Sequence, residues 1–217
     1  MAATLILDFD STLVQTETLD ELALLCLQNH PQAEDIKFSI HTLTQQAMNG
    51  ELDFETALQQ RIALLPLHRE HIDACIDILR NKISTSFLRE RDFFAQEAYR
   101  IYVVSGGFRE IIIPIVEAIG LKASHVYANE FCVDADGKVV GVNSSLLLSK
   151  AQGKVKQIKA LSLESPIIMI GDGYTDYEVK KEGVADVFCL YSEHVERANL
   201  LAFADYNLKD IEKIKYL

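Results

Sequence analysis

The sequence TLILDFDST, at residues 4–12, joins an apolar run to two aspartates, and it decides the fold of the chain. The run at residues 4–7 predicts a short buried strand. Residues two apart in a strand point to the same side, so Asp8 and Asp10 should project together at or just past its carboxyl end. Two carboxylates that lie this close repel each other unless a cation lies between them. The stretch therefore indicates a divalent-metal site, a catalytic pair or both, whereas a solvated turn of Asp and Ser is the simpler alternative.

The composition of the 217-residue chain limits its partners. A net charge of −11 argues against a nucleic-acid surface and against binding to anionic membranes. A small phosphorylated metabolite remains compatible, because a metal and a few lysines can focus positive potential locally. The hydrophobic content of 49% is ample for a core, and nothing in the composition points to a particular oligomeric state.

The first residues predict a cytoplasmic protein. No cationic leader precedes the short apolar run at residues 5–7, so a signal peptide is not expected. No apolar run approaches the roughly 20 residues of a membrane span. The scattered cysteines fit small core residues in a reducing compartment, and the histidines show no metal-ligand spacing.

Residues 15–81 show helical periodicity without an intervening strand. Thr18 and Glu21 fit a capping box, so one helix should begin there and end before Pro31. The further helices are expected at residues 33–48 (stopped by Asn49-Gly50), 54–65 (capped by Asp53) and 69–82. Four consecutive helices predict a helical bundle inserted after the first strand.

Arg61 interrupts an apolar stripe of the third expected helix. Phe54, Leu58 and Leu65 fall on one face, and Arg61 lies in the middle of it. A guanidinium on a buried face needs an anionic partner. Two partners remain open: an acidic residue of a neighbouring helix, or a ligand carboxylate or phosphate in a cleft.

From about residue 85, strands and helices alternate. Strands are expected at residues 99–104, 166–170 and 187–190 and near Tyr206, a hairpin at 125–133 and 138–142, and helices at 108–119 (followed by Gly120) and 153–161. This alternation predicts an α/β fold with a doubly wound, Rossmann-like, mostly parallel sheet. The core should comprise residues 1–14 and 82–217, and the helical cap residues 15–81.

Polar groups collect at three of the expected strand ends. They are the Asp8/Asp10 pair, Ser105-Gly106-Gly107, and Asp172 within Gly171-Asp172-Gly173. In doubly wound sheets, ligands bind beyond the carboxyl ends of the strands. The insertion leaves the core at this same edge, so it can act as a lid.

Four short motifs resemble those of the haloacid-dehalogenase (HAD) superfamily, in the right order and across the whole core. They are DFDST at residues 8–12, Ser105-Gly106-Gly107, Lys154 within Gly153-Lys154-Val155, and GDGYTD at residues 171–176. Residues 8–23, DFDSTLVQTETLDELA, and the insertion around Met48, Phe54 and Arg61 resemble the phosphoserine phosphatases in particular. The resemblance implies a Mg²⁺-dependent hydrolase that converts L-phosphoserine into L-serine and phosphate.

The resemblance also assigns catalytic roles. Asp8 would be the nucleophile that forms an aspartyl-phosphate, and Asp10 would protonate the leaving alkoxide and then activate water. Asp8, the backbone carbonyl of Asp10, and Asp172 would hold Mg²⁺, with Asp176 and Thr175 supporting them. Mg²⁺ suits this set because it favours octahedral oxygen coordination and masks charge that would repel a phosphate dianion.

Phosphate binding falls, by resemblance, to Ser105, Gly106, Gly107 and Lys154. Glycine lets the main chain approach the phosphate closely. The alternatives are an ordinary strand-to-helix turn and a solvated surface lysine, with Lys150 and Lys156 close by in the sequence.

The cap residues would recognise the rest of the substrate. Arg61 would bind its carboxylate and Glu17 its ammonium, while Met48 and Phe54 would line it. Glu17 could instead only favour a helix N-terminus, and the two apolar residues suit a core equally well. Tyr174 stands where relatives usually carry a small residue, which leaves the substrate less certain than the phosphatase chemistry.

Three other functions compete with phosphoserine hydrolysis. A phosphatase for another small phosphomonoester would use Arg61 to hold a different anion. A receiver-type signalling domain also phosphorylates an Asp beside Mg²⁺, but would lack the helical lid and the Asp10 acid. A non-catalytic phospholigand-binding protein would not need every reactive group that the chain carries.

Overall fold

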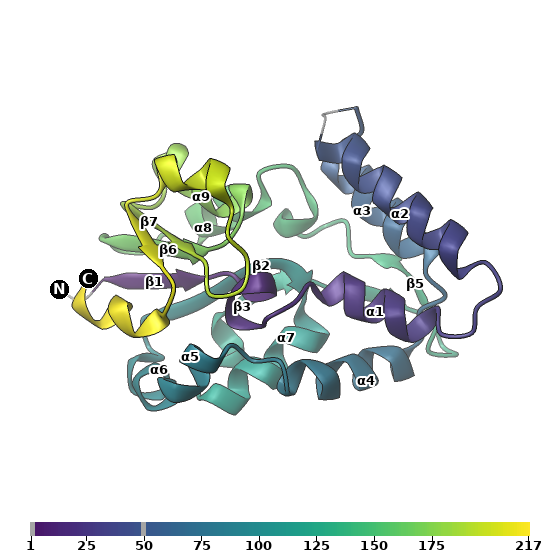
Figure 1. Ribbon diagram of the computed structural model, residues 1–217, viewed down its shortest axis with the longest axis horizontal. Helices are drawn as coiled ribbons and strands as arrows, with labels where there is room; N and C mark the ends of the chain where they lie inside the picture. The colour runs from purple at the N-terminus through teal and green to yellow at the C-terminus, as the bar shows by residue number, and fades with distance from the viewer. Residues whose placement is uncertain (1–2, 49–50) are drawn as a thin grey trace.

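The centre of the fold is strand β1 (Thr4–Leu7), in a computed structural model that describes residues 3–48 and 51–217 (Figure 1). β1 pairs in parallel with β2 (Ile101–Phe108) on one side and with β6 (Ile167–Gly171) on the other. Leu5 and Leu7 belong to one apolar core and Ile6 to another. Because both faces of β1 are covered, the strand must be apolar throughout, which explains the run TLIL.

Six strands form the main sheet in the order β3-β2-β1-β6-β7-β8, with every neighbouring pair parallel. The outer strands are β3 (Val126–Asn129), β7 (Val187–Tyr191) and β8 (Tyr206–Leu208). The chain order reverses at β1, so the carboxyl ends of β1, β2 and β6 flank a topological switch point. The predicted doubly wound α/β fold is confirmed.

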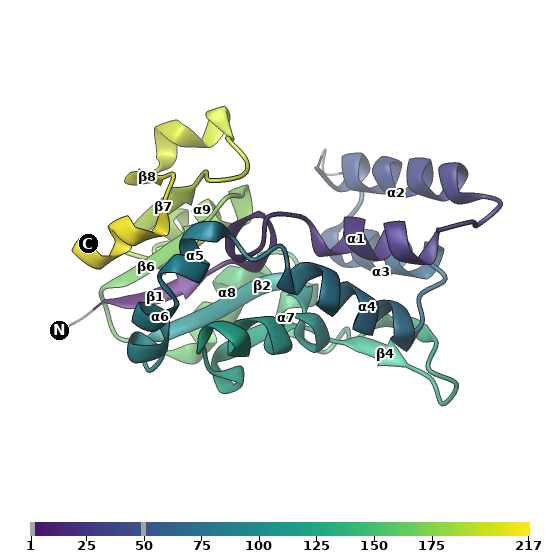
Figure 2. The ribbon, with the colours of Figure 1, turned by 60° about the horizontal axis from the view of Figure 1, so that its bottom comes forward.

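Helices cover both faces of the sheet (Figures 1 and 2). On the Leu5 and Leu7 face lie α5 (Thr85–Arg89), α6 (Arg91–Glu97) and α7 (Arg109–Val116). On the Ile6 face lie α8 (Gly153–Leu161) and α9 (Tyr174–Lys181). Short 3₁₀ turns complete the core: η2 (Glu117–Ile119), η3 (Ala123–His125), η4 (Leu147–Ser149), η5 (Ala198–Phe203) and η6 (Ile211–Tyr216). In the described part of the chain, no helix combines the length and apolar character of a membrane span.

Four helices lie between β1 and the rest of the sheet in the sequence: α1 (Thr18–Cys26), α2 (Ala33–Met48), α3 (Phe54–Leu64) and α4 (Arg69–Arg80). They extend beyond one end of the sheet, with α1 packed on α4, α2 on α3, and α4 on α7 (Figure 1). The chain leaves and returns at one point, because Val14 and Ile83 form an antiparallel bridge. The two chain segments that join the insertion to the sheet therefore lie side by side at the switch-point edge.

A separate hairpin connects the later half of the chain to the insertion. Its strands are β4 (Phe131–Val133) and β5 (Val139–Val142), and β5 packs on α3. The Gln59 amide donates to the Val142 carbonyl at 2.9 Å and accepts from the Val142 amide at 3.2 Å. This paired contact fixes α3 to the hairpin.

Two sequence predictions about these elements are wrong. The expected hairpin arm at 125–133 is divided, because β3 pairs in parallel with β2 of the main sheet whereas β4 pairs with β5 in the hairpin. Between them the Phe131 amide donates to Glu110 at 2.8 Å. The capping box at Thr18 does not form. Thr18 is already helical, its hydroxyl donates to Asp10, and Glu21 accepts from Thr16 at 3.0 Å.

Other boundaries differ more modestly. β2 continues through Ser105-Gly106-Gly107 to Phe108 with an irregular register, and α5 and α6 have no counterpart among the predicted helices. Asp53 caps α3 as predicted, accepting from the Thr56 amide at 2.9 Å, and Gly120 has the left-handed φ of 84° expected of a residue after a helix. The predicted stop at Asn49-Gly50 lies outside the described residues.

Candidate active site

Asp8 lies buried at the carboxyl end of β1, where its position is fixed from two sides. Its amide donates to the Ile170 carbonyl of β6 at 2.9 Å, and its Oδ1 accepts from the Phe9 amide at 2.8 Å. The chain then makes one wide helical turn, η1 (Phe9–Leu13), closed by a 3.0 Å hydrogen bond from the Val14 amide to the Phe9 carbonyl. Ser11 takes a left-handed φ of 52° within it. This turn brings Asp10 back toward the strand ends.

Lys154 lies between two carboxylates. Its Nζ is 2.8 Å from Asp8 Oδ2 and 2.6 Å from Asp176 Oδ1, and all three side chains are nearly enclosed. Burial alone would lower the pKa of Lys154, but the charges of Asp176 and Asp8 outweigh it and the pKa is raised. The lysine is therefore a fixed cation beside the predicted nucleophile, and not the surface residue of the alternative interpretation.

The position of the Asp176 side chain explains why the first residue of the GDGYTD motif, Gly171, is a glycine. Its Oδ2 accepts from the Gly173 amide at 3.0 Å, and a Cβ at Gly171 would lie only 2.2 Å from its Cγ. Only glycine leaves room for this carboxylate at the end of β6.

Asp8, Asp172 and Asp176 form a buried acidic cluster, with one oxygen of each within 4.8 Å of the others. Burial, followed by the charge of Asp8, raises the pKa of both Asp172 and Asp176. Three converging carboxylates fit a hard divalent cation such as Mg²⁺, which would relieve their mutual repulsion. Asp176, predicted only to support the metal from nearby, lies in the cluster itself.

Asp10 lies outside that cluster and has a different environment. Its Oδ1 accepts from both the amide of Thr18, at 3.0 Å, and the Thr18 hydroxyl. A Cβ built at Gly107 would lie 3.6 Å from Asp10 Oδ2, so this second oxygen borders the Ser105-Gly106-Gly107 loop. Burial, followed by the charges of Glu17 and Asp8, raises the pKa of Asp10 well above its ordinary value. The environment thus favours a protonated carboxyl.

The Ser105-Gly106-Gly107 loop is tightly built at its last position. Ser105 Oγ accepts from the Gly107 amide at 3.0 Å, and a Cβ at Gly107 would lie 3.2 Å from Ile112 and 3.3 Å from Ser105 Oγ. Gly106 is open to solvent, with nothing within 4 Å of such a Cβ. Asn129 of β3 donates to the Gly106 carbonyl at 2.8 Å and so fixes this segment to the neighbouring strand.

Glu17 and Arg61 face the same region from the insertion. Glu17 accepts from Ser11 Oγ at 2.6 Å, and burial raises its pKa. Burial lowers the pKa of Arg61, and the negative charges of Asp20 and Glu17 oppose this shift. Its Nε donates to the Ala57 carbonyl at 3.4 Å, and among residues 3–48 and 51–217 it makes no ion pair within 4 Å. The salt bridge of the alternative interpretation therefore does not form at contact distance.

The remaining predicted residues lie less directly at the site. Phe54 is half-buried and packs on the larger core, and Thr175 is exposed beside Gly173. Met48 ends α2, and its side chain is outside what the structure describes. The Tyr174 ring contacts Tyr177 and the Lys181 ammonium along α9.

Three residues of the site carried no recognisable sequence signal. Thr18 binds Asp10 and Asn129 holds the glycine loop, as described above. Arg197 donates to Asp172 Oδ2 through Nε at 2.9 Å and Nη2 at 2.7 Å. It lies in a loop after β7, far from every motif, so only the folded chain reveals the pairing.

The family model for haloacid dehalogenase-like hydrolases matches residues 5–180. The chain belongs to this family and is a phosphoric monoester hydrolase that resembles phosphoserine phosphatase. It is 30% identical to the chloroplastic phosphoserine phosphatase of Arabidopsis thaliana over 95% of this chain and 68% of that protein. It is 32% identical to the phosphoserine phosphatase of Methanocaldococcus jannaschii over 90% of each.

Solved structures show the same similarity. A phosphoserine phosphohydrolase-like protein from Francisella tularensis aligns with a TM-score of 0.82 at 25% identity, covering 99% of both chains. A phospho-aspartyl intermediate analogue of phosphoserine phosphatase aligns with a TM-score of 0.74 at 28% identity, covering 100% of both chains.

Proposed function

We propose that this enzyme hydrolyses L-phosphoserine to L-serine and phosphate, with Mg²⁺, through an aspartyl-phosphate on Asp8. The observation that carries the proposal is the pairing of two unlike carboxyls at one strand end. Asp8 lies 2.8 Å from the Lys154 ammonium, whereas burial and the nearby charge of Glu17 raise the pKa of Asp10. One carboxylate can then attack while its neighbour donates a proton.

The proposed sequence of steps uses the groups at the three strand ends. Ser105 and the amides of the glycine loop hold the phosphoryl oxygens while Asp8 attacks phosphorus. Asp10 gives its proton to the departing serine oxygen, and the resulting carboxylate takes a proton from the water that cleaves the aspartyl-phosphate. Asp8, Asp172 and the backbone carbonyl of Asp10, with Asp176 beside them, would hold Mg²⁺, which would supply charge neutralisation on the phosphoryl oxygens. Lys154 adds a second, fixed positive charge.

The substrate assignment rests on opposite charges in the insertion. Arg61 has no contact ion pair within the described chain, and the carboxylates of Asp20 and Glu17 act on it at longer range. A zwitterionic handle gives each a partner: its carboxylate would meet Arg61 and its ammonium Glu17. The relatives named phosphoserine phosphatase support the same assignment. Residues 15–81 then act as a lid over the core of residues 1–14 and 82–217.

A cytoplasmic setting forms part of the proposal. The four cysteines of the chain, Cys26, Cys75, Cys132 and Cys189, are free thiols in the structure. Unpaired cysteines are typical of proteins that work in a reducing compartment.

The test is a kinetic panel of phosphomonoesters with Mg²⁺. Phosphoserine should be preferred over phosphoethanolamine, which lacks the carboxylate, and over phospholactate, which lacks the ammonium. Asp8→Asn should reduce turnover to background while the melting temperature stays near that of the wild type, and beryllofluoride should bind only when Asp8 is present. A stronger preference for another phosphomonoester would assign the enzyme to that substrate. Substantial activity in folded Asp8→Asn would mean that the nucleophile is misassigned.

A further inference from the structure

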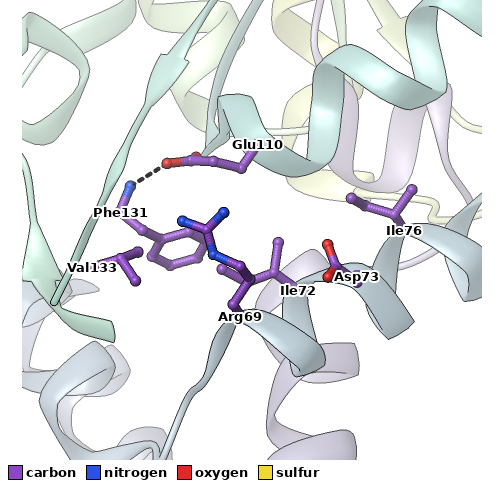
Figure 3. A pocket seen from close by; sticks show the side chains of 7 residues that line it. All are labelled: Arg69, Ile72, Asp73, Ile76, Glu110, Phe131 and Val133. Carbon is purple, nitrogen blue, oxygen red and sulfur yellow. Dashed lines mark hydrogen bonds between the residues drawn. The ribbon is translucent and has the colours of Figure 1, made fainter. Parts of the chain in front are cut away.

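A cavity of about 330 Å³ lies apart from the Asp8 site, between α4, α7 and β4 (Figure 3). Its volume is near the lower end of the roughly 300–1,000 Å³ typical of ligand pockets, so it suits one small molecule. Its lining residues are Arg69, Ile72, Asp73, Ile76, Glu110, Phe131 and Val133. None of them belongs to the phosphatase site proposed above.

Glu110 gives the cavity an unsatisfied acceptor. Its Oε1 accepts from the Phe131 amide at 2.8 Å, but its Oε2 is buried and, among the residues described, has no hydrogen-bond partner. A buried polar atom without a partner costs free energy, because it has lost its hydration and gained nothing in return. A ligand in the cavity that brings a cationic donor to the Glu110 carboxylate would offset this cost.

Arg69 supplies the opposite charge. It extends from the start of α4 with its guanidinium directed toward Phe131 and Glu110 (Figure 3). Its backbone amide donates to the Gly137 carbonyl, but its side chain has no ion pair within 4 Å in the described chain. The cavity therefore presents a cation and a carboxylate, neither of which neutralises the other at contact distance.

The surface between the two charges is apolar. Ile72 and Phe131 are buried, and Ile76 and Val133 pack half-buried on the larger core. A ligand that fills this space needs an apolar body that carries both an ammonium and a carboxylate. A phosphate or a simple dicarboxylate would face repulsion from Glu110 and Asp73, and a plain amine would face repulsion from Arg69.

We propose that this cavity binds a free α-amino acid with an aliphatic side chain. Its ammonium donates to the Glu110 carboxylate, its carboxylate accepts from Arg69, and its side chain packs on Ile72, Ile76 and Val133. The site joins α4 of the insertion to α7 and β4, so an occupied cavity braces the insertion against the sheet-side elements. This inference does not depend on the proposed substrate.

The test is calorimetric titration of the wild-type protein with L-leucine, L-isoleucine and L-valine. Saturable one-site binding is expected for at least one of them. Isoamylamine, which lacks the carboxylate, and 4-methylpentanoate, which lacks the ammonium, should each bind at least about tenfold more weakly than leucine, because each loses one charged hydrogen bond.

Two substitutions place the binding in the cavity. Glu110→Gln keeps an oxygen for the Phe131 amide but removes the charge, and Arg69→Gln removes the cation; each should weaken binding at least about tenfold. Arg80→Gln is the matched control, because Arg80 lies on the same helix but does not line the cavity. Arg61→Ala should also leave binding unchanged, whereas amino acid bound at the phosphatase site would be lost. Melting curves show whether each variant is folded.

Several outcomes would overturn the inference. They are the absence of saturable binding up to the solubility limit of all three amino acids, equal binding of the truncated analogues, equal binding by the wild type and both cavity variants, and loss of binding in Arg61→Ala.

Discussion

Two aspartates two positions apart in one turn have very different neighbours. Asp8 lies within 2.8 Å of the Lys154 ammonium, while Asp10 accepts two hydrogen bonds from Thr18 and faces the charges of Glu17 and Asp8. Separate environments for two adjacent carboxyls are the usual way in which one site holds both a nucleophile and an acid. The raised pKa of Asp10 has a consequence for stability as well as for chemistry.

At the residue scale, Asp10→Asn should stabilise the metal-free protein at neutral and alkaline pH. A folded-state pKa above the unfolded value means that the carboxyl contributes stability at low pH, where it is protonated, and loses it as the pH rises through the folded-state pKa. Asparagine does not titrate and can still accept from Thr18. Melting temperatures in EDTA should therefore be similar for the two proteins near pH 4 and diverge in favour of the variant toward pH 8, although phosphatase activity is lost.

Asp53 provides the matched control for this measurement. It is an exposed cap of α3, and hydrogen bonds from Thr56 lower its pKa, so the sign is opposite. Relative to the wild type, Asp53→Asn should therefore lose stability as the pH rises above about 4. A difference between wild type and Asp10→Asn that stays constant from pH 4 to 8 would contradict the assigned cause.

Site residues that belong to short local sequence patterns can be predicted from the sequence. Asp8 and Asp10 follow an apolar strand, and the glycines mark a loop and a strand end where backbone and side chains approach closely. Thr18 and Arg197 could not be predicted, because each has an ordinary local role in the sequence, at a helix start and in a loop. The Arg197 contact with Asp172 joins residues 25 positions apart, and the Thr18 contact with Asp10 depends on the turn that folds the chain back between them.

At the element scale, Gly171→Ala should disrupt the junction between β6 and α9. The added Cβ would lie 2.2 Å from Asp176 Cγ, so Asp176 must move away from the Lys154 ammonium. We expect a loss of about 1–3 kcal/mol in the free energy of unfolding, the usual cost of overpacking, together with a large loss of activity. Denaturant unfolding and phosphoserine turnover measure the two effects.

Gly173→Ala is the control within the same motif. Its Cβ would lie 3.5 Å from Asp176, an ordinary contact, and its amide would still donate to the carboxylate. Equal losses in the two variants would show that the motif needs glycine for some reason other than the position of Asp176.

Whole elements were predicted where the pattern is local and strong. The apolar run of β1 and the helix α8 (Gly153–Leu161) match their predicted ranges, and α2 begins and ends where periodicity places it. The short helices α5 and α6 escaped prediction because each is too brief to establish a helical period. The predicted hairpin arm was too long because β3 and β4 are largely apolar and only Glu130 separates them in the sequence, so the pattern does not show that they join different sheets.

At the scale of the whole molecule, the insertion and the sheet meet around the acidic cluster. The chain enters and leaves the insertion at the bridge between Val14 and Ile83, and the hairpin holds α3 through Gln59. Substrate bound at the strand ends would thus contact both parts. The cluster of Asp8, Asp172 and Asp176 lies on the sheet side of this junction.

Removal of divalent metal should abolish activity. EDTA removes the cation that the clustered carboxylates would hold, so turnover should fall to background and recover when Mg²⁺ is added in excess. Ca²⁺ should inhibit, because it prefers more ligands at longer distances and could bind Asp8 through both oxygens, which removes the attacking one. Turnover measured after exhaustive dialysis decides the matter: full activity without divalent metal would rule out the proposed role of the cluster.

In the proposed function, substrate choice depends on the contact between the insertion and the core, and Arg61 tests it. The guanidinium projects from α3, has no contact ion pair in the described chain, and is held by Nε at the Ala57 carbonyl. If it binds the substrate carboxylate, it should tighten binding, help to close the lid and orient the ester. Loss of one partner from such a desolvated pair costs about 2–5 kcal/mol, or roughly thirty-fold to several-thousand-fold. Arg61→Ala should therefore lose that much kcat/KM on phosphoserine.

The comparison substrate separates recognition from folding. p-Nitrophenyl phosphate carries neither carboxylate nor ammonium, so Arg61→Ala should hydrolyse it almost as the wild type does. Arg61→Lys should recover little, because an ammonium cannot form the two parallel hydrogen bonds that a guanidinium gives to a carboxylate. Gln60→Ala changes the exposed neighbour on the same helix and should leave both substrates unaffected. If Arg61→Ala lost the same factor on both substrates, Arg61 would be a structural residue of the lid, and the substrate assignment would lose its main support.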